Sequence, residues 1–260
     1  MKFLLPIALL ISCGEAEKEI LPCETLFGSP SASTGLGDAE CGPACECGEK
    51  PFTPQALSEA ELQALEAATP ANAPAVLSED PYTTDPDANP DASLFCGILG
   101  EASSYTLQSF DSEAAAADAG AKITHSGACG QCSSLQNLAV YMRIGDLKEP
   151  VQACAMKGMF EGEAANRECL EELGFDEACA QIWYFNSKHT SEVCLDICMA
   201  NLDAPHHKED GSLNDCVQCD EDESGGVFKT YSGRTRRNSG LPSSLCRPCE
   251  SVTPVFHDYF

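Results

Sequence analysis

The hydrophobic and polar positions along the chain predict a mainly helical domain that begins near Leu94. In the stretch SSLQNLAVYMRIG, apolar side chains recur every three or four residues, so they share one face of a helix. That face carries Leu135, Leu138, Ala139 and Met142. Gly145 favours the end of this helix, because glycine readily adopts the conformations that stop one.

Cap residues predict further helices. Ser112 precedes EAAAADA, which Gly120 can end. The others are EAANRECLEELGF, ending at Gly174, EACAQIWYFNSK, capped by Asp176, and EVCLDICMANL, capped by Thr190 or Ser191. Two short stretches favour strands, AKITH at 121–125 and GVFKTYSG at 226–233. The expected fold class of residues 94–260 is therefore mainly α with small β elements.

Residues 13–93 are predicted to form a disordered, acidic, low-complexity tether. Between residues 14 and 93 there are 16 acidic residues against Lys18 and Lys50, and Pro, Ala, Ser and Gly dominate. Such a segment has little apolar surface with which to build a core. Two islands interrupt it. Cysteines at 23, 41, 45 and 47 predict a small knot over residues 23–47, and the capping box of Ser58 and Glu61 predicts a short helix over 58–68.

The N-terminus has the pattern of an export signal. Lys2 precedes an apolar run over residues 3–11, which is too short to span a bilayer and fits a signal peptide. The sequence Leu-Ile-Ser-Cys at 10–13 resembles the lipobox of bacterial lipoproteins. The resemblance implies that residues 1–12 are a signal peptide and that Cys13 carries a lipid. It also implies attachment to a membrane, at the bacterial outer membrane or cell surface.

Composition sets the compartment and excludes one class of partner. Lys plus Arg is 15 against 41 Asp plus Glu, a net charge of -26, which repels nucleic acid. Of 17 cysteines, 16 remain after the lipobox cysteine, enough for eight bridges in an oxidising compartment. Cys194 and Cys198 share one helix face, so each is expected to bond to another helix, at Cys154, Cys169 or Cys179. No metal site and no cofactor is predicted.

The stretch ITHSGACGQCSSLQ carries His125, Cys129 and Cys132, the best candidates for catalysis. Both cysteines stand at the start of a predicted helix, where the helix dipole lowers a thiol pKa and favours a redox dithiol. Two further Cys-x-x-Cys pairs, at 216/219 and 246/249, indicate instead that this spacing serves a disulfide scaffold.

The same run, SGACGQCSS, resembles the Cys-Gly-Ser-Cys-Trp run of papain-family peptidases. The resemblance implies Cys132 as the nucleophile and His257 as its base. Gln131 and Ser133 depart from the family pattern, and Ser126 stands where the family has a glutamine. We therefore predict structural half-cystines. The alternative is an extracytoplasmic thiol enzyme that uses Cys129 or Cys132. A thiol-disulfide oxidoreductase ranks first in that class, and a papain-like cysteine peptidase ranks second.

Cations gather in one segment near the C-terminus. It holds Lys229, Arg234, Arg236, Arg237 and Arg247, a third of all Lys and Arg in the chain. Guanidinium groups bind carboxylate, sulfate or phosphate in forked geometry, which predicts an anion-binding or protein-binding site at the first four. The acidic run CDEDES at 219–224 is the alternative, internal partner.

The order of SGACGQCSSLQ, IWYFN, CVQCDEDESGGVFK and GRTRRNSGL resembles an uncharacterised cysteine-rich secreted family, a resemblance that implies no activity. The sequence thus predicts a surface-anchored lipoprotein whose disulfide-rich domain has a binding or structural role. Its expected partners are a membrane, through the lipid on Cys13, and an anionic ligand or a protein.

Overall fold

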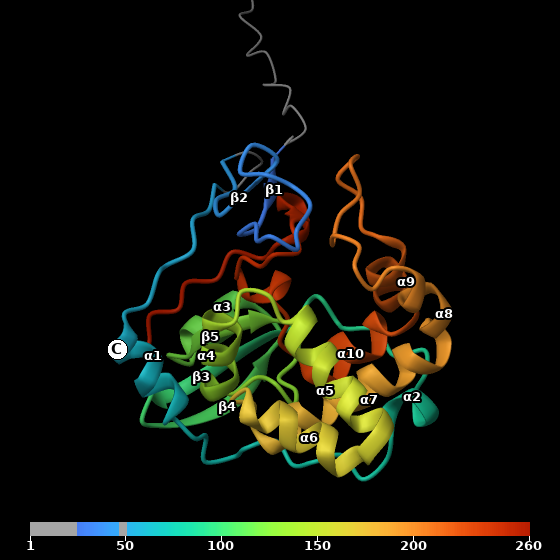
Figure 1. The fold of residues 1–260 in the computed structure, drawn as a ribbon. Coiled ribbons are helices and arrows are strands. Elements are labelled where there is room, and N and C mark those ends of the chain that lie inside the picture. Colours follow the sequence, from blue (N-terminus) through green and yellow to red (C-terminus); the bar gives the residue numbers. More distant parts are fainter. Residues whose placement is uncertain (1–24, 47–50) are drawn as a thin grey trace, which may run out of the picture.

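The computed structural model describes residues 25–46 and 51–260. In this part of the chain the predicted class is confirmed, with ten helices, two small sheets and seven disulfides. Figure 1 shows the larger sheet with α1, α3 and α4 on one side of the molecule and α5 to α10 on the other. A small sheet, β1 and β2 with β6, lies at one end.

The larger sheet has the strand order β4-β3-β5 and is antiparallel throughout. Its strands are β3 (Phe95–Glu101), β4 (Ser104–Phe110) and β5 (Lys122–Ser126). The tight connection from β3 to β4 needs Gly100, whose φ is +103° and where a Cβ would meet the Ser104 carbonyl oxygen at 2.5 Å. Strand β5 confirms the AKITH prediction, whereas the β3–β4 hairpin was not predicted. Ser112 caps α3 (Glu113–Asp118), also as predicted.

The remaining helices follow β5 in sequence. They are α4 (Leu135–Arg143), α5 (Lys148–Glu161), α6 (Glu163–Glu172), α7 (Glu177–Val193), α8 (Leu195–Ala200), α9 (Asp215–Glu223) and α10 (Gly225–Ser232). Asp176 caps α7 by accepting the Cys179 N–H at 2.9 Å, as its sequence predicts. Helix α7 contacts α5, α6, α8, α9 and α10, so it is the centre of the helical side.

The apolar stripe predicted on α4 is confirmed, and it faces the main core. Leu135, Leu138 and Ala139 are fully buried there, in one cluster with Ile98 of β3 and Ile182 of α7. Burying a leucine side chain contributes about 1.5–3 kcal/mol. The stripe therefore joins the sheet to the helices.

Strand pairing and two disulfides link the N-terminal segment to the C-terminal end of the chain. Strand β1 (Leu26–Phe27) pairs with β2 (Cys41–Gly42) and with β6 (Arg247–Pro248). Cys41 bonds to Cys246, and Cys45 bonds to Cys249. The expected knot within residues 23–47 is thus wrong for Cys41 and Cys45, because their partners lie more than 200 residues away. The other two cysteines of that knot, at 23 and 47, lie outside the described residues, as do residues 1–22.

The predicted short helix forms, but it packs on the domain. Helix α1 (Glu59–Glu66) has the predicted capping box of Ser58 and Glu61, and it contacts α4. Helix α2 (Pro81–Thr84) contacts α7 and α10, and its Tyr82 is buried. The described residues of 25–93 therefore contribute to the folded body, which corrects the tether prediction for that part. A few scattered apolar residues are enough to hold this segment on the domain, because each of them packs against the core formed by the sheet and the helices.

One strand prediction and one helix-cap prediction in the C-terminal half are also corrected. GVFKTYSG is the helix α10, not a strand, because packing against α7 and α9 overrides the local β preference of Val, Phe and Tyr. Thr190 and Ser191 cap nothing, since α7 continues to Val193 and α8 starts after Cys194. Two short 3₁₀ helices, Arg237–Ser239 and Cys249–Ser251, complete the described elements.

All fourteen cysteines in the described part of the chain form disulfides, which indicates an oxidising, extracytoplasmic location. None of the helices in residues 25–46 and 51–260 has the length and apolar character needed to cross a membrane.

Candidate functional site

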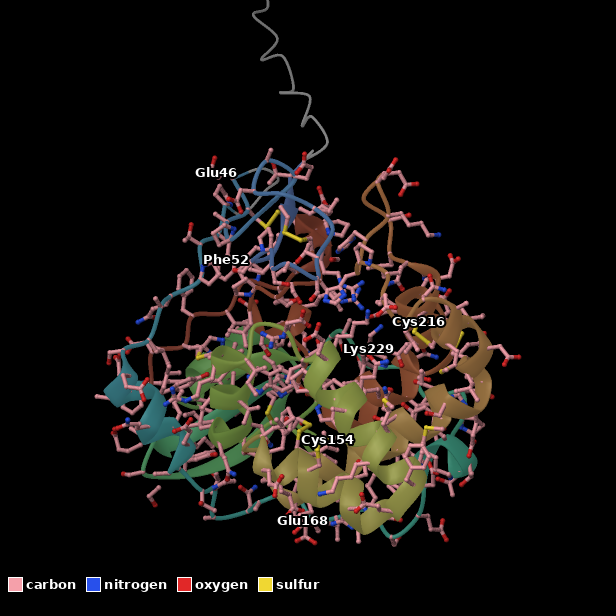
Figure 2. All side chains as sticks on the ribbon, in the orientation of Figure 1. Glu46, Phe52, Cys154, Glu168, Cys216 and Lys229 are labelled. Atoms are coloured by element: carbon pink, nitrogen blue, oxygen red, sulfur yellow. A yellow bond between two sulfur atoms is a disulfide. The ribbon has the colours of Figure 1, made fainter. Side chains whose placement is uncertain are left out.

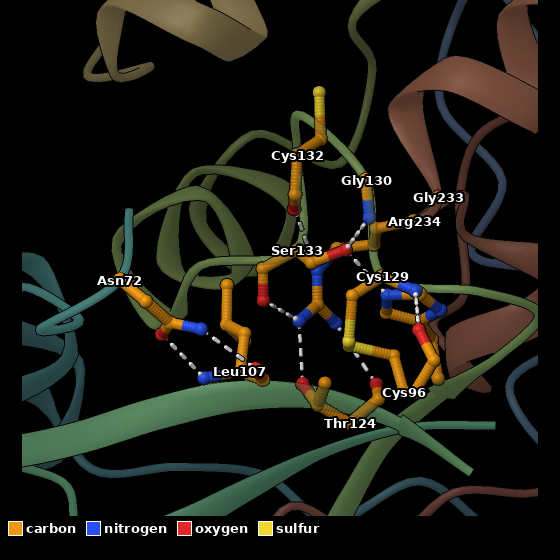
Figure 3. Close-up of a disulfide and its surroundings, with 12 residues drawn as sticks. Asn72, Cys96, Leu107, Thr124, Cys129, Gly130, Cys132, Ser133, Gly233 and Arg234 are labelled. Atoms are coloured by element: carbon orange, nitrogen blue, oxygen red, sulfur yellow. Dashed lines mark hydrogen bonds between the residues drawn. A yellow bond between two sulfur atoms is a disulfide. The ribbon is translucent and has the colours of Figure 1, made fainter. Parts of the chain in front are cut away.

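Cys129 and Cys132, the predicted catalytic pair, do not bond to each other. Cys129 bonds to Cys96 on β3, and Cys132 bonds to Cys179 on α7. Figure 3 shows the first of these disulfides beside the loop that carries both cysteines. Because both sulfurs are in covalent links between elements, neither is a thiolate nucleophile. The structure does not favour the thiol-enzyme alternative.

The other Cys-x-x-Cys pairs have the same arrangement, each cysteine bonding outside its own pair. Cys216 and Cys219 of α9 bond to Cys198 and Cys194. The prediction that Cys194 and Cys198 do not bond to each other is confirmed. The partners expected for them were wrong, because Cys154 bonds to Cys169 and Cys179 bonds to Cys132.

His125 contacts a serine in the same loop. Its Nε2 lies 2.7 Å from Ser133 Oγ, which also accepts the Gly130 N–H at 2.8 Å. Its Nδ1 lies 2.8 Å from the Ser126 carbonyl oxygen, so Nδ1 carries the proton and no carboxylate orients the ring. Burial, and then the charge of Arg234, lowers the pKa of His125 well below its usual value. Since His125 and Ser133 are both fully buried, this pair shapes the loop and meets no substrate.

Arg234, predicted to bind a ligand, is 0% exposed. Its guanidinium donates to the backbone carbonyls of Thr124, Cys132 and Ser133 and to the hydroxyls of Thr124 and Ser239. Figure 3 shows it between β5 and the disulfide loop. The side chain joins these two segments and is closed to any ligand.

Arg236, predicted to belong to the same binding site, is committed to the C-terminal end of α4. It donates to the carbonyl oxygens of Tyr141 at 2.6 Å, of Pro242 at 3.1 Å and of Ile144. A cation placed on the last carbonyls of a helix is stabilised by the helix dipole. Burial lowers the pKa of Arg236 to about 10, so it remains a cation at neutral pH.

The remaining three cations converge on one carboxylate. Glu221 of α9 lies 3.0 Å from Lys229, 2.6 Å from Arg237 and 2.7 Å from Arg247. We call Lys229, Arg237 and Arg247 the cation cluster. Burial alone would raise the pKa of Glu221, but the three cations outweigh it and hold the value at about 2. The acidic run CDEDES therefore supplies an internal partner for the cationic segment, which was the alternative interpretation. A single carboxylate of that run, Glu221, pairs with all three cations.

Two members of the cation cluster have hydrogen-bond donors that Glu221 does not use. Arg237 and Arg247 each donate to Glu221 through Nη2, and within the described residues their other guanidinium N–H groups make no hydrogen bond. The neighbouring Asp220 forms no ion pair with them, although its charge acts on Lys229 and Arg247. It accepts hydrogen bonds from Thr190 and Asn186 instead, and burial raises its pKa. Positive charge is in excess at this point.

The cation cluster lines a cleft of about 560 Å³ between α5, α7, α8, α9 and α10. Figure 2 shows Lys229 near the middle of the view, beside Cys216 of α9. The other walls are mainly apolar. They include Met156, Met159 and Phe160 of α5, Met199 of α8 and Leu202, together with Trp183 and Phe228, which are partly buried against the core.

Residues 163–255 match the model of a family of unknown function, DUF8771. This span contains α6 to α10 and the whole cation cluster with Glu221. Comparison with curated proteins and with solved structures gives no match. The chain therefore contains a disulfide-rich domain, and its cleft is the candidate functional site.

Sequence reasoning found part of this site. Lys229 and Arg237 were predicted and lie in the cleft, whereas Arg234 and Arg236 are structural. Arg247 was recognised as part of the cationic segment but was not placed in the binding set. The apolar walls had no signal in the sequence, because no single helix shows that its exposed methionines face those of another helix.

Proposed function

We propose that this chain is an extracytoplasmic binding protein that is held at a membrane by a lipid on Cys13. Its cleft binds an anionic ligand through the cation cluster. The observation that carries the proposal is the meeting of Lys229 of α10, Arg237 and Arg247 at one solvent-open cleft, with one carboxylate among them.

The net charge of -26 does not oppose such a site. Charges in water are screened over about 8 Å at physiological ionic strength. The field that a ligand meets inside the cleft is therefore set mainly by the groups that line it, and these carry an excess of positive charge. Guanidinium groups with free N–H donors suit carboxylate, phosphate or sulfate.

Glu221 has the role of an orienting residue in this proposal. It accepts from all three cations and so holds their side chains in the cleft before any ligand arrives. Pre-orientation lowers the conformational entropy that binding would otherwise cost. The incoming anion takes the guanidinium N–H groups that Glu221 leaves free.

Titration with inorganic phosphate and with acetate, followed by NMR or calorimetry, tests the anion site. Arg237→Gln and Arg247→Gln should each weaken binding about tenfold. Arg143→Gln is the matched control, because Arg143 is an ion-paired arginine on α4 that lies outside the cleft. If phosphate and acetate both fail to bind, or if all three variants bind equally well, the proposed anion site is wrong.

The anchor has a separate test. The lipobox-like sequence at 10–13 motivates it, and mass spectrometry of the native protein should find acyl chains on Cys13. Cys13→Ala should yield an unlipidated precursor, because the modification needs the thiol. An unmodified Cys13 in the native protein would refute the anchor and leave the cleft proposal untouched.

A further inference from the structure

We infer that the anion is the head group of a single-chain amphiphile, in chemical terms a long-chain carboxylate, whose chain lies along the apolar walls of the cleft. This inference rests on the proposed anion site and adds the class of the ligand. It is carried by the distribution of charge and apolar surface inside one cavity.

The cleft is polar at one end and apolar farther along. Helix α5 begins beside the N-terminal segment and residue 244, where Ser33 donates to Glu149 and the Ser244 N–H donates to the Gly145 carbonyl. Arg247 follows Ser244 by three residues. Arg236, next to Arg237 in the chain, donates to the Ile144 carbonyl just before α5. Arg237 and Arg247 of the cation cluster therefore belong to the end of the cleft where α5 starts. Met156 to Phe160 lie eight to twelve residues later in sequence than Lys148, which on a helix is roughly 12–18 Å farther along. A ligand whose anionic head group binds at the cationic end would therefore have its chain along the apolar end.

The apolar side chains that form the walls are large, yet they are exposed to solvent. Phe160 is 83% exposed, Met159 59% and Met199 58%. Three of the five methionines of the chain, Met156 among them, line this one cleft. Methionine is flexible and polarizable, so it adapts to an alkyl chain without a fixed shape. Apolar surface gathered in this way marks a site that another apolar group covers.

Disulfides fix both walls of the cleft. Cys154 and Cys169 join α5 to α6, which supports the wall carrying Met156, Met159 and Phe160. Two more disulfides join the α8 segment to α9, which supports the opposite wall. The walls are therefore fixed in position while the side chains on them remain adaptable, which suits a ligand with a defined head and a flexible tail.

Two other occupants fit the observations less well. A second copy of the chain would bring together two bodies that each carry a net charge of -26. A protein helix would need a wide groove, whereas a cavity of about 560 Å³ is in the usual range for a small molecule. Charge complementarity with the cation cluster favours one anionic head.

The single tryptophan provides the assay, because Trp183 lines the cleft. Its fluorescence should saturate on titration of the whole protein with dodecanoate, below the concentration at which dodecanoate forms micelles. We expect dodecanoate to bind at least about a hundredfold more tightly than acetate, since chain burial adds to the contact of the head group. Dodecanol, which has the chain without the charge, should bind more weakly than dodecanoate.

Variants of the two parts of the site separate this inference from the proposed function. Met199→Ser should weaken dodecanoate binding about tenfold and leave acetate binding unchanged. Ile197→Ser is the matched control, because Ile197 is an exposed residue of the same helix that does not line the cleft. Arg247→Gln should weaken the binding of both ligands.

The outcomes are distinguishable. If dodecanoate and acetate bind with equal affinity, the amphiphile inference fails and the anion site stands. If dodecanol binds as tightly as dodecanoate and acetate does not bind, the anion site itself is wrong. A Met199→Ser variant with unchanged dodecanoate affinity would also overturn the inference. Saturable binding of dodecanoate that depends on both Met199 and Arg247 supports it.

Discussion

Replacing Glu221 with glutamine tests whether the cation cluster is organised as described. The change keeps the size of the side chain and removes the one negative charge that Lys229, Arg237 and Arg247 share. Three cations that are mostly shielded from water then face one another without compensation. The fold should lose stability at neutral pH.

The size of the loss follows from the pKa. Glu221 has a pKa of about 2 in the fold against 4.5 for an ordinary glutamate. One pKa unit corresponds to about 1.4 kcal/mol, so the ionised form is favoured by about 3 kcal/mol over a neutral one. Removal of one partner from a buried ion pair gives a similar range of about 3–5 kcal/mol. A loss of about 3 kcal/mol lowers the melting temperature of a chain of this size by about 6–12 °C.

The dependence on pH follows from the sign of the shift. Because folding lowers this pKa, the stabilisation is present above pH 4.5 and is lost as the pH falls toward 2. The difference between wild type and Glu221→Gln should be about 3 kcal/mol at pH 7 and should shrink below pH 4.5. Urea unfolding with intact disulfides, followed by far-UV circular dichroism, measures it without added salt.

Glu223→Gln is the matched control. Glu223 is an exposed residue of the same helix and forms no ion pair in the part of the chain that the structure describes. Its replacement should change the free energy of unfolding by less than about 0.5 kcal/mol. The reasoning is refuted if both variants unfold alike at pH 7, or if the loss in Glu221→Gln is the same at pH 2.5.

Three further predictions concern the frame of the domain. Replacing Cys132 and Cys179 together with serine opens a loop of 47 residues, and should cost about 4 kcal/mol in a thermal melt of the otherwise oxidised protein. Burial, followed by the charge of Arg234, lowers the pKa of His257 to about 3. The unfolded chain therefore binds a proton that the fold excludes, and stability should fall as the pH decreases from about 6.5; a flat pH profile between 6.5 and 4 in urea unfolding would contradict this. Arg234→Lys should cost at least about 3 kcal/mol, because an ammonium group cannot serve its forked set of acceptors, and a melt equal to that of Arg143→Lys would contradict it.

The cation cluster shows how one segment can hold residues with two different roles. Arg234 and Arg236 are used by the fold, since their donors are satisfied by backbone carbonyls. Arg237 is one residue farther along and turns to Glu221 and the cleft. Adjacent cations in the sequence thus divide between the interior of the fold and the cleft, according to which side of the chain meets the core.

Local features of the sequence are enough to predict many of the helices. Ser58, Ser112 and Asp176 cap helices where they were expected to, because a cap is a hydrogen bond between neighbours in the chain. The stripe on α4 follows from the helical period alone. The number of cysteines indicates an oxidising compartment, since it depends on composition and on no contact.

Tertiary structure alone decides which residues meet. The partner of Cys41 is Cys246, 205 residues away, and nothing in the neighbourhood of either cysteine specifies that pairing. Packing against α7 and α9 makes a helix of GVFKTYSG, because the free energy of burial exceeds the small local preference for a strand. The cleft is also decided by the tertiary structure. Its three cations and its methionine walls come from segments that the fold brings together, so their common cleft exists only in three dimensions.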